Sequence, residues 1–303
     1  MTATLPAPGA DPVAFAELPP AALLHGWRRT WFRFRRRRSA VIALVFVVLM
    51  LLAAIFAPWL APHDPNDPHF GDRHASFSRE FLLGTDDLGR DVLSRMLFGL
   101  RTSLLAAAIS VAIALVVGLV IGTISGYLGG RTDSVVMRII DGILAVPGLL
   151  LMMAIIGVLG AGLRSVIIGL GIAFFPTFTR LSRAQVLAVK EEQYVEAARV
   201  TGATDRRILL RHVVPNSMSP VIVQALMTMG FALLAEGALS YLGLSVQPPG
   251  SSLGTLLERG FDYKEQTQRL IILPGLVITS LSWAFNVVAD GLRDAVGLAE
   301  VGP

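Results

Sequence analysis

Long apolar runs alternate with short polar segments along this chain. Six of these runs carry few charged residues, and each reaches the length of about 20 residues that a helix needs to cross the hydrocarbon core of a bilayer. The runs are residues 39–61, 102–128, 134–159, 165–187, 217–244 and 270–288. The pattern therefore predicts an all-α, polytopic membrane protein with six transmembrane helices.

The composition supports a membrane solvent. Hydrophobic residues make up 53% and charged residues 16% of the 303 residues, whereas soluble domains carry about 25% charged residues. A water-soluble enzyme is therefore disfavoured. The chain has no cysteine, which excludes disulfides, thiolate metal sites and a cysteine nucleophile. The first run is also too long and too far from the start for a cleaved signal peptide, so we expect it to be retained.

The distribution of arginine predicts the orientation. Seven arginines precede the first apolar run: Arg28, Arg29, Arg33, Arg35, Arg36, Arg37 and Arg38. Basic residues mark the cytoplasmic ends of membrane helices. The N-terminus is therefore predicted to be cytoplasmic, and six crossings return the C-terminus to the same side. Nucleic-acid binding, the other common use of an arginine run, does not fit so apolar a chain.

Glycines and prolines inside the runs predict how the helices pack and bend. Gly118, Gly122 and Gly126 recur every four residues and share one helix face. Small residues at this spacing allow two backbones to approach closely in lipid. Pro147 and Pro176 lie inside the third and fourth runs, where we expect kinks rather than ends.

Acidic residues inside apolar runs need a partner, because an unpaired carboxylate at the bilayer centre costs about 2.5–3.5 kcal/mol on insertion scales. Asp141 follows Arg138 by three residues and is expected to pair with it on one helix face. Glu236 lies deeper in its run. It is expected either to line a transport pathway or to pair with another helix.

The cytoplasmic segment 188–216 is predicted to contain two short helices. Helix-forming residues fill 191–200, and Gly202 follows at the place where a left-handed C-terminal turn favours glycine. Thr204 or Asp205 can cap a second helix that stops before Pro215. From its charge alone, the segment is equally well described as a solvated basic loop.

The spacing within this segment resembles a known signature. The order is Glu196, Ala197, Ala198, three residues, Gly202, twelve residues and Pro215. It is similar to the EAA motif of ATP-binding-cassette (ABC) importer permeases. The family pattern prefers Ile and Leu at the positions of His212 and Val214, so this copy of the motif is degenerate near its end.

Other segments carry a resemblance to one branch of these permeases. Residues 81–95, FLLGTDDLGRDVLSR, resemble an outside segment of the dipeptide and oligopeptide permeases, and SYLGLSVQPP (240–249) and DGLRDA (290–295) match the same branch. The arginines before the first run and residues 39–65 resemble the extra N-terminal unit of its C-type subunit. The resemblance spans about residues 35–296 and identifies the chain as a member of the dipeptide, oligopeptide and nickel ABC importer permeases.

The resemblance implies a type I ABC importer permease in the bacterial inner membrane. Such a subunit is not an enzyme: it pairs with a second permease, two ATP-binding subunits and an extracytoplasmic binding protein. ATP and Mg²⁺ are expected on the ATP-binding subunits, since neither lysine of this chain follows a glycine as a phosphate-binding loop requires. The residues implied to couple ATPase closure to alternating access are Glu196, Ala197, Ala198, Gly202, Asp205 and Pro215.

The expected division of the chain follows from the runs and the resemblance. It comprises a disordered cytoplasmic tail (1–30), a basic flank with the first membrane helix (31–65), a periplasmic loop (66–101), a five-helix core with the coupling loop 188–216 (102–296) and a C-terminal tail (297–303).

The sequence can be compared with two other functions of membrane proteins. An ion-coupled secondary transporter would also have six spans, although no convincing internal repeat is present. An intramembrane hydrolase lacks support because HExxH and GxSxG motifs do not occur. We expect no metal site: three histidines of one outside loop have no rigid ligand spacing. The cargo is expected to be peptides, with nickel complexes, haem and other small solutes as alternatives.

Overall fold

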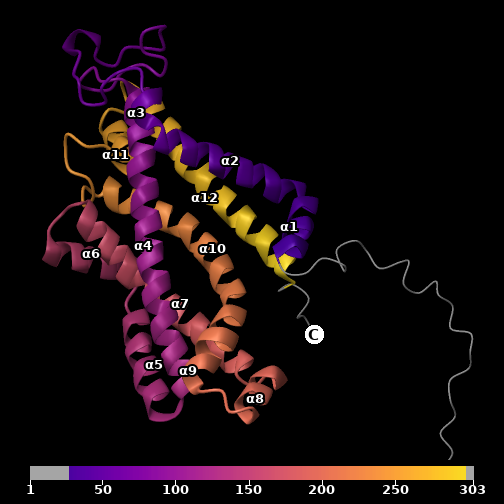
Figure 1. The fold of residues 1–303 in the computed structure, drawn as a ribbon. Coiled ribbons are helices and arrows are strands. Elements are labelled where there is room, and N and C mark those ends of the chain that lie inside the picture. The colour runs from indigo at the N-terminus through magenta and orange to yellow at the C-terminus, as the bar shows by residue number, and fades with distance from the viewer. Residues whose placement is uncertain (1–26, 298–303) are drawn as a thin grey trace, which may run out of the picture.

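The computed structural model describes residues 27–297 (Figure 1), so the expected tails lie almost entirely outside it. Apart from one isolated antiparallel bridge between Thr85 and Asp91, the regular elements of this described part are helices. In chain order they are α1 (Trp27–Arg36), α2 (Arg38–Ile55), α3 (Ala57–Leu60), η3 (Phe70–Asp72), α4 (Val92–Leu128), α5 (Gly130–Leu144), α6 (Gly148–Leu159), α7 (Leu163–Val189), α8 (Gln193–Val200), α9 (Asp205–Ile208), η4 (Leu209–Val213), α10 (Val214–Tyr241), α11 (Leu253–Asp262) and α12 (Arg269–Val296).

Five helices are long and apolar enough to cross a membrane. They are α2, α4, α7, the continuous stretch from α9 through α10, and α12. The pair α5 and α6 passes the same test as one bent unit, which gives up to six spans. The prediction of an all-α, six-span membrane protein is confirmed with this pair counted as the third span.

The third span differs from the predicted single kinked helix. The axes of α5 and α6 meet at 88°, and Pro147 is the N-cap of α6. Proline has no N–H to donate and disfavours helical backbone at the residue before it, so the helix ends there and restarts. Pro176 is different, because α7 continues through it from one end to the other.

The two long polar segments between apolar runs, residues 62–101 and 245–269, contain more helix than the pattern predicts. α4 begins at Val92, inside the segment predicted as a loop up to residue 101. Asp91 caps this helix, since its carboxylate accepts hydrogen bonds from the backbone N–H of Ser94 (2.9 Å) and from its hydroxyl (2.6 Å). In the second loop, Ser252 and Thr255 form a reciprocal capping box that starts α11.

The glycine face of α4 lies directly against α7. A methyl group on Gly122 would be 2.3 Å from the carbonyl oxygen of Thr179, and one on Gly118 would be 2.7 Å from the carbonyl oxygen of Phe175. A methyl group on Gly126 would be 3.0 Å from the carbonyl oxygen of Arg183. The two backbones are therefore in contact along three turns, as small residues allow.

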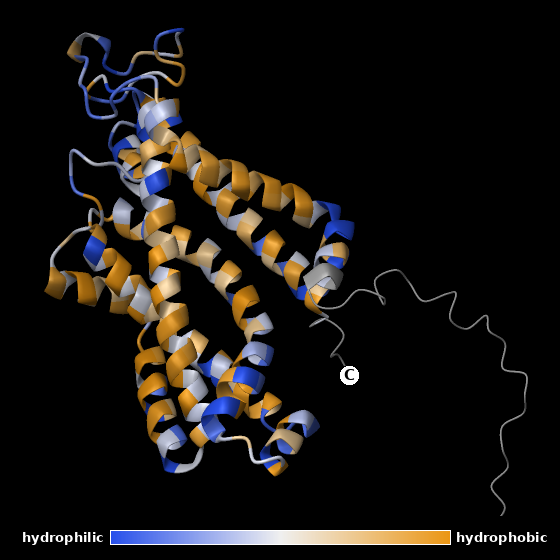
Figure 2. Ribbon diagram, in the orientation of Figure 1, coloured by the Kyte–Doolittle hydropathy of each residue, from blue (hydrophilic) through white to orange (hydrophobic). Residues whose placement is uncertain are grey.

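Apolar side chains also cover much of the outer surface. Figure 2 shows mainly hydrophobic residues along α2, α6 and α12, where Ile42, Val158 and Trp283 are well exposed. Exposed apolar area of this extent is unusual for a soluble monomer and suits a surface that faces lipid.

Candidate functional site

The segment between α7 and α10 folds into a compact elbow, which we define as residues 190–213 with α8, α9 and η4. Figure 1 places the elbow at one end of the bundle, opposite to α3, α11 and the irregular segment that precedes α4. Helix α1 and the end of α12 lie together, also away from that segment. This arrangement agrees with an even number of crossings between the two ends of the described chain.

Gly202 makes the turn that separates α8 from α9. Its φ is +83°, in the left-handed region that non-glycine residues rarely adopt. The N–H groups of Gly202 and Ala203 donate to the carbonyl oxygens of Arg199 (3.0 Å) and Ala198 (3.1 Å). This pair of bonds is a Schellman motif, which satisfies the last carbonyls of α8 and fixes the direction of the chain.

A small apolar core seats the elbow on the end of α7. Val195 of α8, Ile208 of α9, Val213 of η4 and Val186 of α7 are all fully buried and form one cluster. Tyr127, at the end of α4, packs against the same cluster. The elbow is therefore a packed unit attached to two membrane helices, and not a free basic loop.

The outer face of α8 is exposed. Glu196, Ala197 and Val200 all point outward, and the side chain of Val200 is 83% exposed. Tyr194 is also exposed, and partial burial together with Glu192 raises the pKa of its hydroxyl. Ala198 is half-buried. The tip of the elbow thus presents Ala197 and Val200 next to the exposed side chains of Tyr194, Glu196 and Arg199.

The second helix of the elbow does not stop before Pro215, contrary to the prediction. α9 passes into the π-helical turn η4 and then into α10, so a continuous helical path leads into the membrane. The N–H of Val214 donates to the carbonyl oxygen of Leu209, one residue further back than in an α-helix. Proline cannot donate and crowds the preceding turn, and the wider π turn directly before Pro215 accommodates both effects.

Asp205 connects the elbow to α4. Its carboxylate accepts a hydrogen bond of 2.7 Å from the hydroxyl of Tyr127. Thr204, in the N-cap position of α9, makes no capping bond through its side chain. Asp205 thus holds the elbow to α4, a helix far away in sequence, and its role in coupling stays a prediction.

Two ion pairs join α5 to α7 near the elbow. Arg183 of α7 binds both carboxylate oxygens of Asp133, which also accepts a hydrogen bond of 2.6 Å from Ser125 of α4. Asp141 pairs with Arg180 of α7, and not with Arg138 as predicted. Arg180 and Asp141 are 39 residues apart in sequence and lie on different helices. Helix periodicity identifies neighbours within one helix only, so it could not predict this pair.

Glu236 lies in a buried cluster of hydroxyl groups. Its Oε1 accepts hydrogen bonds from Ser240 (2.6 Å) and Ser245 (3.3 Å), and Ser240 accepts one of 3.0 Å from Ser252, the N-cap residue of α11. Its side chain is fully buried, and within the described residues Oε2 has no hydrogen-bond partner. The direct partners of Glu236 thus lie in its own helix and in the loop that follows it, and a place on the transport pathway stays a prediction.

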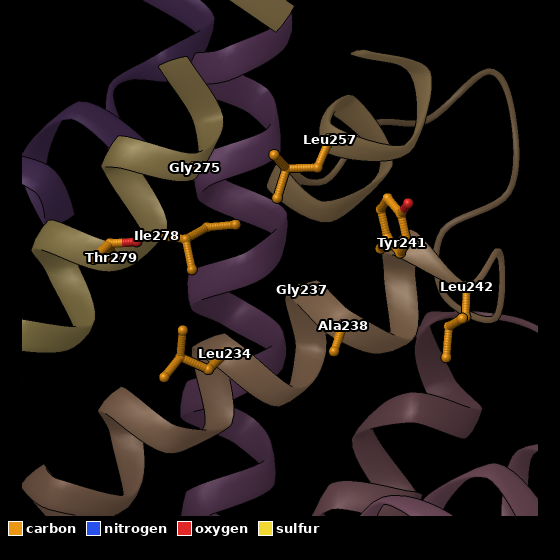
Figure 3. A pocket seen from close by; sticks show the side chains of 9 residues that line it. All are labelled: Leu234, Gly237, Ala238, Tyr241, Leu242, Leu257, Gly275, Ile278 and Thr279. Carbon is orange, nitrogen blue, oxygen red and sulfur yellow. The ribbon is translucent and has the colours of Figure 1, made fainter. Parts of the chain in front are cut away.

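An apolar pocket of about 410 Å³ lies between α10, α11 and α12 (Figure 3). Its polar side chains are those of Tyr241 and Thr279. Gly237 lines it, whereas the neighbouring Glu236 does not. In the part of the chain that the structure describes, no three His, Cys, Asp or Glu residues gather as a metal site.

The outside segment 84–95 is held by buried ion pairs that the sequence pattern did not reveal. Asp86 accepts a hydrogen bond of 2.8 Å from Nε of Arg90, and Nε of Arg95 lies 3.4 Å from the same carboxylate. Asp87 pairs with Arg259 of α11. Asp86, Arg90 and Arg95 are all almost fully buried, so the segment is a rigid cap joined to α4 and α11.

Comparisons with known families match both parts of the chain. Residues 118–298 match the family described as binding-protein-dependent transport system inner membrane component. Residues 26–77 match the N-terminal transmembrane domain of oligopeptide transport permease C. The second match covers the basic helix α1, the first span and part of the outside segment.

Named relatives are similar over nearly their whole length. The dipeptide transport system permease protein DppC of Haemophilus influenzae is 36% identical over 272 residues, which are 88% of this chain and 92% of the relative. The di/tripeptide transport system permease protein DppC of Pseudomonas aeruginosa is 40% identical, over 88% and 90% of the two chains. The glutathione transport system permease protein GsiD of Shigella flexneri is 41% identical, over 89% of each.

Solved structures share the fold. Two inward-facing crystal forms of the MetNI methionine ABC transporter have chains that superpose with TM-scores of 0.51 and 0.53 at 17% identity. They cover 64% and 66% of this chain and 94% and 97% of their own. At this identity the likeness concerns the fold alone. With the family match and the relatives, it leads to one conclusion: this chain belongs to the inner-membrane permease components of binding-protein-dependent ABC import systems, which are multi-pass, non-catalytic transport subunits.

Proposed function

We propose that this chain is one of two permease subunits of an ATP-driven importer of di- and oligopeptides, and that its elbow docks on an ATP-binding subunit. ATP and Mg²⁺ bind on that partner, and an extracytoplasmic protein delivers the peptide. The second permease completes the translocation path. In this scheme residues 102–296 are the permease core, residues 31–65 are an added N-terminal unit, and closure of the ATPase pair moves the elbow.

The observation that carries the proposal is the construction of the elbow. Its outer face is exposed and carries Ala197 among larger and charged side chains, while its inner face is fixed by four fully buried side chains on α7, α8, α9 and η4. A partner that grips Ala197 and Glu196 therefore moves a rigid unit continuous with α10. Switching a two-state pore from 1:99 to 99:1 takes about 5.5 kcal/mol, which requires such a rigid connection.

The peptide cargo is proposed from the relatives, whose names specify dipeptide, di/tripeptide and glutathione transport. The pocket in Figure 3 offers apolar contacts and two hydroxyl groups but no charged side chain for a peptide terminus. We therefore expect cargo selection to lie mainly with the binding protein. Import of nickel complexes or haem in place of peptides would overturn this part of the proposal.

A cross-linking experiment tests the docking directly, because the chain has no native cysteine. Ala197→Cys places a single thiol on the outer face of α8, and Leu82→Cys places one on an exposed position of the outside segment as a control. In the complete importer, a bifunctional thiol reagent should join Ala197→Cys to the ATP-binding subunit and leave Leu82→Cys unjoined. An unjoined Ala197→Cys in every nucleotide state would overturn the docking.

A turn variant tests the coupling. Gly202→Val should reduce peptide uptake and peptide-stimulated ATP hydrolysis in proteoliposomes, because a β-branched residue cannot adopt the left-handed turn without strain. Gly202→Asn is the matched control, since asparagine tolerates this conformation and no atom lies within 4 Å of an added Cβ. Full uptake by Gly202→Val would remove the coupling role.

A further inference from the structure

Helix α1 combines basic and aromatic residues in a way that the transport scheme above does not use. Its sequence, WRRTWFRFRR, contains no acidic residue and places Trp31 and Phe34 on one face and Arg33 and Arg36 on the opposite one. Figure 2 shows it as a mainly hydrophilic helix at the end of the apolar α2. An amphipathic helix of this kind suits the boundary between lipid headgroups and acyl chains.

The aromatic face of α1 closes an apolar pocket against two membrane helices. Phe34 is buried against Gly291 of α12 and stacks on Trp31, with ring centroids 5.9 Å apart. The pocket has a volume of about 180 Å³. It is lined by Thr30, Trp31, Phe34, Leu44, Val288 and Leu292. No polar surface lines the pocket, so it suits a hydrocarbon chain.

A second pocket adjoins the first. It has a volume of about 290 Å³, lies between α1, α10 and α12, and shares Thr30 and Leu292 with the first pocket. Two neighbouring, mainly apolar pockets thus lie beside a helix that ends in arginines.

Positive charge borders the apolar pocket. The guanidinium of Arg35 lies 6.0 Å from the centroid of the Trp31 ring, which forms one wall. The next residue, Arg36, lies 4.8 Å from the ring centroid of Phe32, which does not line the pocket, and both arginines are exposed. Within residues 27–297, the run from Arg33 to Arg38 forms a single ion pair, between Arg37 and Asp294. The other guanidinium groups can therefore bind a phosphate.

From these features we infer that α1, α2 and α12 form a binding site for an anionic glycerophospholipid of the cytoplasmic leaflet. An acyl chain occupies the pocket beside Trp31 and Phe34, and the headgroup phosphate binds Arg35 and Arg36. The lipid fixes α1 against α12 at the membrane boundary. This inference does not depend on docking of the ATP-binding subunit, because it uses none of the elbow residues.

Native mass spectrometry of the complete, detergent-purified importer tests the site with phosphatidylglycerol as the probe. Phosphatidylcholine with the same acyl chains and inorganic phosphate serve as comparison ligands. The wild type should retain phosphatidylglycerol in preference to phosphatidylcholine. Arg35→Gln/Arg36→Gln should bind it about 30-fold more weakly, given roughly 1 kcal/mol per arginine near an anionic lipid surface. Arg131→Gln/Arg138→Gln removes the same charge from exposed positions of α5 and should bind normally.

Two more variants separate the parts of the site. Leu44→Trp fills the pocket and should reduce lipid retention although all arginines remain, whereas Arg35→Lys/Arg36→Lys keeps the charge and should restore most of the binding. Equal retention of the two lipids, or unchanged binding in Arg35→Gln/Arg36→Gln or in Leu44→Trp, would overturn the inference. Full displacement by inorganic phosphate would also overturn it, because the site would then recognise a free anion.

Discussion

Replacing Gly122 by alanine tests the contact between α4 and α7 on which the bundle depends. The added carbon would lie 2.3 Å from the carbonyl oxygen of Thr179, 2.9 Å from Cβ of Ser182 and 3.0 Å from the backbone nitrogen of Arg183. Ordinary contacts between non-bonded carbon atoms are about 3.5–4.0 Å. Because two of the three neighbours are backbone atoms, rotation of a side chain cannot relieve the clash, and the helices must move apart by about 1 Å.

The magnitude follows from two opposing effects. Overpacking a well-packed interface costs about 1–3 kcal/mol, and three short contacts place this change near the upper end. Alanine stabilises a helix interior by about 1 kcal/mol relative to glycine. We therefore expect Gly122→Ala to destabilise the chain by about 2 kcal/mol. Gly142→Ala in α5 is the matched control, since no atom lies within 4 Å of its added carbon.

Thermal unfolding of the purified importer, followed by tryptophan fluorescence, measures the difference. The two variants should differ by about 3 kcal/mol, because only Gly142→Ala gains helix propensity without a clash. At about 2 °C per kcal/mol for a chain of this size, Gly122→Ala should unfold about 6 °C below Gly142→Ala. Equal unfolding temperatures would refute the backbone contact between α4 and α7.

Variants at three polar contacts provide further tests. Glu236→Gln should keep the hydrogen bonds of the serine cluster and unfold near the wild-type temperature, whereas Glu236→Leu should lower stability by about 1–3 kcal/mol per hydroxyl left unpaired; the opposite order in a thermal scan would contradict the buried cluster. Tyr127→Phe removes only the hydroxyl that binds Asp205 and should raise the number of ATP molecules hydrolysed per peptide imported, while an unchanged ratio would show that this bond is not needed for coupling. Exchanging Asp133 and Arg183 should restore assembly that either single exchange impairs, and failure of the double variant in pull-down of the second permease would argue against a specific ion pair.

The number of membrane spans and the turn at Gly202 could be predicted because each depends on local information. The length and hydropathy of one segment are enough to identify a membrane span. A glycine between two short helical patterns likewise indicates a left-handed turn. Pro147 and Pro215 show the limit of such local reasoning. Both lack an N–H, yet the helix breaks at Pro147 and continues through Pro215, where a π turn widens the backbone.

Contacts between distant segments could not be predicted from one sequence. Asp141 was expected to bind Arg138, three residues away, because the nearest opposite charge on one helix is the only partner that periodicity identifies. Its actual partner, Arg180, lies on α7, which reaches α5 only after the chain has reversed through α6. The same limit applies to the bond between Tyr127 and Asp205 and to the buried ion pairs of the outside segment.

The length of α4 connects these distant contacts. Its 37 residues extend about 55 Å, whereas the hydrocarbon core of a bilayer is about 30 Å thick. One end begins at Asp91 in the ion-paired outside segment, and the other end carries Tyr127, which binds the elbow. Because the glycine face joins α4 to α7 along its inner half, a displacement of the elbow has to move α7, α4 and the outside segment together. If the elbow docks on the ATP-binding subunit as proposed, distances between the elbow and the exposed residue 82, measured by paired spin labels, should therefore stay constant through the nucleotide cycle. A change in these distances would contradict a rigid connection through α4.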